Sequence, residues 1–128
     1  MRAKFKILIS EHLYELCQIC SAILGADCEA ITVERCSDKV IAAIRKHLPH
    51  IVFLESDNSL CDAVEIISQV RNDKGDKLHV FMVITHSFSE ECRVTAVGVD
   101  YIFLKPIDWF YMANRIQHMA NWNQQLSI

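Results

Sequence analysis

Five short apolar runs alternate with five segments of helical periodicity along this 128-residue chain, and this alternation restricts its fold more than any other feature. The runs occupy residues 7–9, 30–33, 51–54, 80–84 and 101–104. They lack a regular apolar–polar alternation, so we expect both faces of each strand to be buried. Buried strands that are separated by helices indicate a parallel sheet covered on both faces. With right-handed crossovers, the chain is predicted to form a doubly wound α/β domain.

The ends of the helical segments can be predicted from residues that favour helix starts and stops. We expect caps at Ser37 or Asp38 for the second helix, Ser87 or Ser89 for the fourth, and Asp108 for the fifth. Expected stop signals are Gly25, Pro49 and Gly98. The residues expected to carry the apolar face of the last helix are Phe110, Ala113, Ile116 and Met119.

Length, charge and hydropathy narrow the classes of protein to consider. A chain of 128 residues suits one domain, which we place at residues 1–120, with 121–128 as a polar tail or the start of a linker. The net charge of −3 is spread along the chain, which disfavours direct binding of nucleic acid. No apolar run approaches the roughly 18 residues of a membrane span, and the start does not resemble a signal peptide. We therefore expect a cytoplasmic protein that does not contact a membrane.

Six cysteines are scattered through the chain, and Cys17 and Cys20 form the one Cys-x-x-Cys pair. Such a pair can be a redox centre or half of a zinc site, but zinc would need a second close pair of ligands. The pair also lies within a helical pattern rather than at a helix start, where a thiolate would be stabilised. We therefore interpret these cysteines as reduced core residues.

Polar and charged residues follow four of the expected strands at their carboxyl ends. They are Glu11 and His12 after the first strand, Glu55 after the third, Thr85 after the fourth and Lys105 after the fifth. The carboxyl ends of parallel strands meet at one edge of a sheet, where ligands of open α/β folds bind. These residues therefore define one candidate site.

Several short motifs, in their order and spacing, resemble the receiver domain of two-component response regulators, the CheY-like superfamily. The motifs are Pro49 to Glu55 at the third strand, Asp62-Ala63, Thr85, Gly98-Val99-Asp100 and Lys105-Pro106. The resemblance covers about residues 5 to 120 and implies a flavodoxin-like fold, with five strands in the order 2-1-3-4-5 and five helices.

The resemblance also implies a function, phosphorelay signalling, from which this chain departs at important positions. Such receivers accept a phosphoryl group on an aspartate after the third strand, where this chain has Glu55. Magnesium is held by an acidic pair after the first strand, here Glu11-His12. The usual proline four residues after the acceptor is Ser59, and the aromatic switch position three residues before the lysine is Ile102.

These departures predict a degenerate receiver, or pseudo-receiver, that signals without aspartyl phosphorylation, is not an enzyme and needs no cofactor. An imidazole at His12 suits magnesium poorly, and glutamate at position 55 displaces the carboxylate by one methylene. We expect Glu55 to reach Lys105 directly or through one water, because a partly buried lysine needs a counter-charge. Two alternatives remain: phosphorylation at Glu55 or Asp57, or a small-ligand or metal-binding module at the same rim.

A protein partner or an adjacent output domain is the expected ligand of such a module. Receivers of this family commonly communicate through the fourth helix, fifth strand and fifth helix, and a homodimer through this face is one expectation. Four residues of this face are candidates for the contacts: Tyr101, Trp109, Tyr111 and Met112. The alternative is that these side chains pack under the last helix of a monomer.

Overall fold

The computed structural model contains one five-stranded sheet in the order β2-β1-β3-β4-β5, and all neighbouring strands are parallel. The structure describes residues 5–10, 14–25, 28–55, 62–73, 80–85 and 88–126. Strands and helices alternate along the chain throughout these ranges. The predicted flavodoxin-like α/β fold, with its strand order and five helices, is confirmed.

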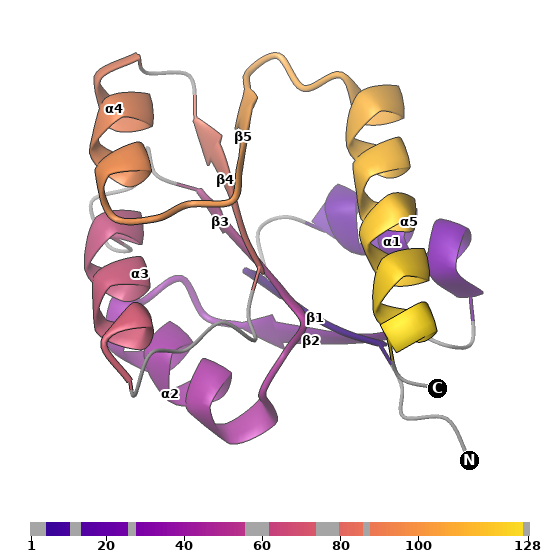
Figure 1. Cartoon of the computed structure of the whole chain (residues 1–128), viewed down its shortest axis with the longest axis horizontal. Helices are drawn as coiled ribbons and strands as arrows, with labels where there is room; N and C mark the ends of the chain where they lie inside the picture. The colour runs from indigo at the N-terminus through magenta and orange to yellow at the C-terminus, as the bar shows by residue number, and fades with distance from the viewer. Residues whose placement is uncertain are drawn as a thin grey trace.

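The helices cover both faces of the sheet (Figure 1). The strands are β1 (Phe5–Ser10), β2 (Cys28–Val33), β3 (Ile51–Glu55), β4 (Val80–Thr85) and β5 (Tyr101–Leu104). The helices are α1 (Tyr14–Leu24), α2 (Ser37–His47), α3 (Ala63–Arg71), α4 (Phe88–Ala96) and α5 (Trp109–Leu126). Helices α1 and α5 pack together on one face, while α2, α3 and α4 cover the other. None of these described helices is both long and apolar enough to cross a bilayer.

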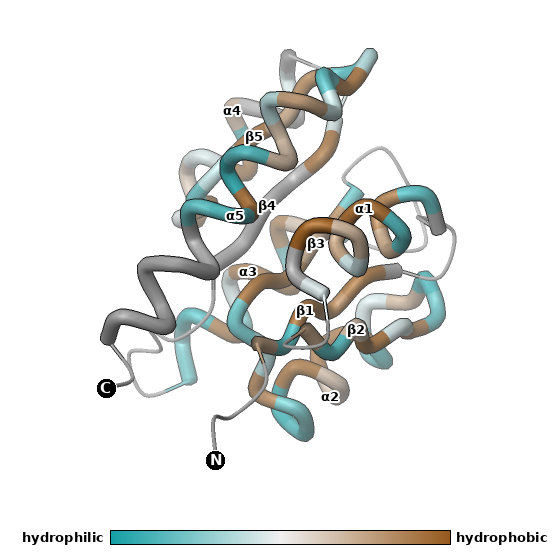
Figure 2. Tube along the Cα trace, turned by 90° about the vertical axis from the view of Figure 1, so that its right-hand side faces the viewer, coloured by the Kyte–Doolittle hydropathy of each residue, from teal (hydrophilic) through white to brown (hydrophobic). Residues whose placement is uncertain are grey.

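Two apolar cores lie on the two faces of the sheet, and the central strands contribute to both. In β3, Ile51 and Phe53 face the core beneath α1 and α5, whereas Val52 and Leu54 face the core beneath α2, α3 and α4. All four side chains are almost completely buried. Figure 2 shows hydrophobic colour along much of β1 and β3. Burial on both faces explains why the strand sequences show no polar alternation.

The helix starts agree with the sequence at α5 and differ from it at α2. Asp108 caps α5, because its carboxylate accepts a hydrogen bond of 3.1 Å from the backbone N–H of Tyr111. The prediction of a Ser37 or Asp38 cap was wrong, since α2 begins at Ser37 after Cys36, which makes no side-chain cap. The Ser37 hydroxyl instead accepts a hydrogen bond of 2.8 Å from the backbone N–H of Asp62, and so joins the starts of α2 and α3. Helix α4 begins at Phe88, so Ser89 lies inside it, and the alternative cap, Ser87, lies outside the described residues.

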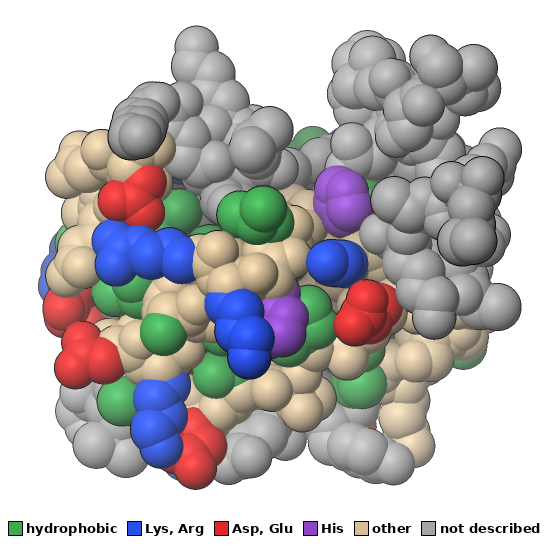
Figure 3. All heavy atoms as spheres, turned by 90° about the horizontal axis from the view of Figure 1, so that it is seen from below, with side chains coloured by type: hydrophobic (Ala, Val, Ile, Leu, Met, Phe, Trp, Pro, Cys, Tyr) green, Lys and Arg blue, Asp and Glu red, His purple; other side chains and the backbone are tan. Residues whose placement is uncertain are grey.

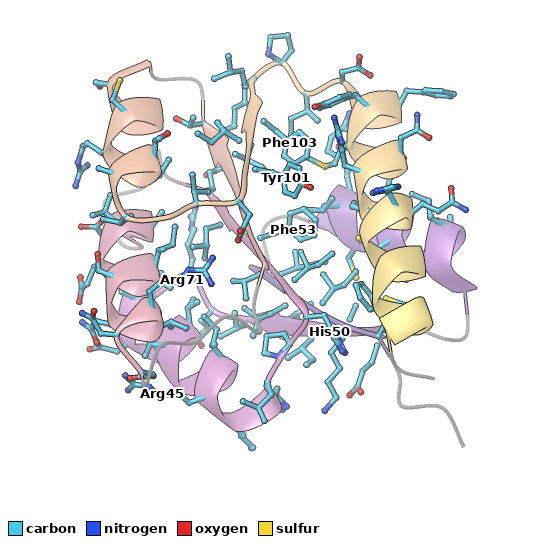
Figure 4. The ribbon with its side chains drawn as sticks, viewed as in Figure 1. Arg45, His50, Phe53, Arg71, Tyr101 and Phe103 are labelled. Atoms are coloured by element: carbon cyan, nitrogen blue, oxygen red, sulfur yellow. The ribbon has the colours of Figure 1, made fainter. Side chains whose placement is uncertain are left out.

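Helices α2 and α4 end near the predicted positions through left-handed backbone conformations. Leu48, directly before Pro49, has φ 50° and closes α2. Gly98 has φ 93° after α4. Arg71, at the end of α3, donates to the Gly98 carbonyl at 3.2 Å and to Asp100 Oδ2 at 2.7 Å. This contact holds the α4–β5 turn against α3, and so fixes where β5 begins (Figure 4).

The apolar face of α5 was predicted correctly at Ile116 and wrongly at Phe110. Phe110, which we expected in the core, is 82% exposed, whereas Met112 and Ile116 are fully buried. Met112 and Ile116 are four residues apart and lie on one side of the helix, and Phe110 points elsewhere. The helix also continues to Leu126, so the domain boundary placed at residue 120 falls within α5.

Candidate functional site

The candidate site lies where β3, β4 and β5 end. Glu55 is the last residue of β3, Thr85 is the last residue of β4, and Lys105 follows β5. The backbone N–H of Lys105 donates to the Thr85 carbonyl at 2.9 Å, which places these two residues side by side. The strand register therefore brings three of the predicted residues to one rim. Glu11, His12, Asp57 and Ser59 lie outside the described residues.

An ion pair joins Glu55 and Lys105 across this rim. The Lys105 Nζ lies 3.0 Å from Glu55 Oε2. The Glu55 side chain is 14% exposed and that of Lys105 is 33% exposed, so the contact is partly shielded from water. The ion pair predicted from the sequence is confirmed. Because one methylene more than aspartate lengthens the Glu55 side chain, its carboxylate reaches the lysine without a bridging group.

Thr85 contributes to this rim from below the surface. Its side chain is fully buried, and among the described residues it is the polar one in the buried set. Burial of a hydroxyl is costly unless it is hydrogen-bonded. Of the three described rim residues, Glu55 and Lys105 are the ones that present charge toward solvent.

The switch position and its neighbour lie on opposite faces of β5, as the two-residue period of a strand requires. Ile102 packs against the core beneath α3 and α4, and Tyr101 packs against the core beneath α1 and α5. Figure 4 shows Tyr101 and Phe103 directed toward α5. Both aromatic neighbours of the switch position, Tyr101 and Phe103, therefore lie on the other side of the sheet.

Arg115 of α5 organises the aromatic side chains on that side, a role that sequence reasoning missed. Its guanidinium lies 5.8 Å from the Tyr101 ring centroid and 5.3 Å from that of Tyr111. Its Nε donates to the Tyr111 hydroxyl at 3.3 Å, and Tyr111 meets the edge of Phe103 at 5.9 Å. The i, i+4 spacing of Tyr111 and Arg115 was the available signal. These contacts tie α5 to β5.

The predicted interaction surface is only partly exposed. Trp109 is 37% exposed and Tyr111 is 47% exposed. Met112 is fully buried and packs under the last helix, as the alternative interpretation predicted. Phe110, which was not among the predicted contact residues, extends the exposed apolar surface of α5 and is 82% exposed. We call the set of Trp109, Phe110 and Tyr111, at the start of α5, the α5 patch.

The described cysteines are free thiols, and the pair in α1 belongs to the core. Cys20 is fully buried, and Cys17 and Cys28 pack against the same core. Burial, followed by the neighbouring thiols of Cys28 and Cys17, raises the pKa of Cys20 to about 12. Burial also raises the pKa of Cys28. Within the described ranges no group of His, Cys, Asp and Glu side chains is placed to hold a metal ion.

Comparison with known proteins rests on structure, because no protein-family model matches the sequence. The signal receiver domain of a DNA-binding response regulator from Colwellia psychrerythraea 34H is 16% identical, with a TM-score of 0.80 over 92% of this chain and 99% of its own. The chemotaxis response regulator CheY4 of Vibrio cholerae is 18% identical, with a TM-score of 0.72 over 91% and 98% of the two chains.

A third similar structure is the phosphorylated cyanobacterial phytochrome response regulator RcpA, which is 17% identical, with a TM-score of 0.67 over 91% of each chain. The similarity covers nearly the whole of each receiver. At these sequence identities the likeness is one of fold. This chain therefore has the fold of the receiver domains of response regulators.

Proposed function

We propose that the chain is a pseudo-receiver, a signalling and protein-interaction module of a two-component type regulator whose output does not depend on aspartyl phosphorylation. The observation that carries this proposal is the 3.0 Å ion pair between Glu55 and Lys105. It occupies the position where, by resemblance, a receiver has its acceptor aspartate and the lysine that contacts the phosphoryl group.

The ion pair argues against phosphoryl transfer for two physical reasons. Catalysis of this reaction is almost entirely positioning and charge stabilisation, and an error of about 1 Å can cost about 100-fold in rate. The extra methylene of Glu55 introduces a displacement of that order. In addition, the Lys105 ammonium is already bonded to the Glu55 carboxylate and would have to release it to contact an incoming phosphoryl group.

The donor set also does not fit magnesium. This ion requires a near-octahedral set of hard oxygen ligands. The Glu55 carboxylate is engaged by Lys105, and His12 offers nitrogen where a second carboxylate would be needed. On this proposal the module has no cofactor and is not an enzyme.

A negative charge is instead built permanently into the rim. The Glu55 carboxylate stands where a phosphoryl group would add charge, and Ile102 provides no ring that could move in response. A ligand or modification shifts an equilibrium only if it binds two states differently. We therefore expect one dominant conformation that presents the α5 patch to a protein partner or an adjacent output domain, or to a second copy through the α4–β5–α5 face.

Intact-mass measurement after incubation with acetyl phosphate and magnesium tests the proposal. We expect no added phosphoryl mass in the unmodified chain. The double variant Glu55→Asp with His12→Asp should gain some phosphorylation, because it restores the acceptor length and the carboxylate pair. Each single variant serves as the control for that gain.

A different outcome would support the second candidate, a receiver with an unusual acceptor. This candidate is supported by Lys105 and the buried Thr85, which occupy the rim positions that by resemblance contact a phosphoryl group. A mass increase of one phosphoryl group would contradict the proposed pseudo-receiver. Its loss in Glu55→Gln would identify Glu55 as the acceptor, and its loss in Asp57→Asn would identify Asp57.

A further inference from the structure

His50 forms an unusual joint at the edge of the sheet opposite the rim, between the starts of β1 and β3. The backbone N–H of Lys6 donates to His50 Nδ1 at 2.9 Å, and the backbone N–H of His50 donates to the Lys6 carbonyl at 2.8 Å. The imidazole also stacks on the Phe5 ring, with centroids 4.7 Å apart and planes 13° from parallel. Figure 4 shows His50 beside β1, far from Tyr101 and Phe103.

This geometry requires a neutral imidazole with its proton on Nε2. A backbone N–H is always a donor, so the atom that faces it must be an acceptor. A protonated imidazole carries hydrogen on both nitrogens and has no acceptor left. Protonation would therefore set two N–H groups against each other and break the Lys6–His50 hydrogen bond.

Three elements place charged or titratable side chains near the joint. From β1, the Lys6 Nζ donates to the His47 carbonyl at the end of α2, at 3.3 Å. From β2, Glu29 is the register partner of Lys6 and is exposed. From α2, His47 is half-buried. Arg115 of α5 is engaged with Tyr101 and Tyr111 instead. Histidine and cationic side chains lie next to one another on the face seen from below (Figure 3).

We propose that His50 makes this joint acid-sensitive: uptake of a proton at Nδ1 releases Lys6 and loosens the contact between the starts of β1 and β3. The joint is independent of the rim, and the proposal does not rest on the pseudo-receiver function. Because the unfolded chain accepts the proton at His50 without losing a hydrogen bond, unfolding is coupled to proton uptake. The free energy of unfolding therefore decreases as the pH falls and is retained as the pH rises.

Urea unfolding of the full chain at several pH values tests this device. Between about pH 7.5 and about pH 5.5, the range around the ordinary titration of histidine, the wild-type unfolding constant should rise by up to about tenfold per pH unit more than that of His50→Asn. Asparagine keeps an oxygen acceptor near the Nδ1 position but does not titrate. His47→Asn is the matched control, and it should keep the wild-type pH dependence.

A direct measurement keeps the proposal testable even if the variant folds poorly. Long-range ¹H–¹⁵N NMR of the wild-type chain near neutral pH should show His50 as the Nε2-protonated tautomer, and the Lys6 amide signal should titrate together with it. An Nδ1-protonated tautomer, or a difference between wild type and His50→Asn that does not change with pH, would overturn the proposal.

Discussion

At the residue scale, the Glu55–Lys105 pair differs in environment from the more exposed Arg45–Asp73 pair. Arg45 and Asp73 form a bidentate ion pair, with contacts of 2.9 and 3.2 Å, and both side chains are about half exposed. Glu55 is only 14% exposed. Water screens the Arg45–Asp73 pair strongly and the Glu55–Lys105 pair much less. Removal of one partner should therefore change the stability of the domain more at Glu55–Lys105.

Replacement of Lys105 should therefore destabilise the domain more than loss of a surface pair. We expect Lys105→Ala to lower the free energy of unfolding by about 1–3 kcal/mol, because it leaves the Glu55 carboxylate partly buried and unpaired. Urea unfolding at neutral pH measures the change. The double variant Lys105→Ala with Glu55→Gln should recover part of the loss, because a neutral amide needs no counter-charge.

The surface pair supplies the control for this prediction. Arg45→Ala should have a smaller effect than Lys105→Ala, since Arg45 and Asp73 return to water when separated. Equal effects of the two substitutions would show that the shielding of Glu55 contributes nothing, and would weaken the argument for a fixed charge at the rim.

At the scale of the elements, α5 is the helix whose orientation matters most for function. Its first turn is capped by Asp108, and Arg115 contacts the Tyr101 ring of β5. With this anchoring, Met112 and Ile116 enter the core while Phe110 is left on the surface. The rotation of α5 thus creates the α5 patch and removes Met112 from it.

Two neighbouring substitutions test this rotation. Met112→Ala should lower the free energy of unfolding by about 2–5 kcal/mol, the usual effect of emptying a filled core position. Phe110→Ser should change it by no more than about 0.5 kcal/mol, because the ring already lies in water. Thermal or urea unfolding of both variants provides the measurement. A large loss for Phe110→Ser with a small one for Met112→Ala would mean that α5 has the phase first predicted.

At the scale of the whole molecule, the two edges of the sheet have separate roles. The carboxyl edge carries the rim and the α5 patch, and the amino edge carries the His50 joint. The sheet between them is buried on both faces. This separation allows the effect of a substitution on association to be measured apart from its effect on stability.

Association through the α5 patch can be measured on the isolated chain. We expect the average mass in sedimentation equilibrium to rise toward that of a dimer as concentration increases, since exposed aromatic side chains favour interface cores. Phe110→Ser should shift the molecule back to the monomer without a loss of stability. Arg45→Ala, at the far end of α2, should leave the association unchanged.

A monomer at every concentration, for both wild type and Phe110→Ser, would contradict self-association through the α5 patch. The patch would then have to serve a different protein or an adjacent output domain. The stability measurement on Phe110→Ser remains informative in that case, because it reports on the phase of α5 alone.

The sequence by itself determined the parallel sheet, the strand order through its resemblance to receivers, the Asp108 cap and the Gly98 stop. These depend on local properties: the burial of short apolar runs, a carboxylate that bonds a nearby backbone N–H, and a residue with free access to positive φ. The pairing of Glu55 with Lys105 was also predictable, because parallel strands bring their carboxyl ends to one edge.

Only the tertiary structure decided the phase of α5, the use of Ser37 and the joint at His50. The spacing of Phe110 and Ala113 with Ile116 is as good as that of Met112 with Ile116, and only packing against α1 and the sheet decides that Phe110 lies outside the core. Ser37 bonds Asp62 and His50 bonds Lys6, across 25 and 44 residues respectively. Such contacts depend on how distant segments are placed in space, and neither spacing nor propensity along the chain contains that information.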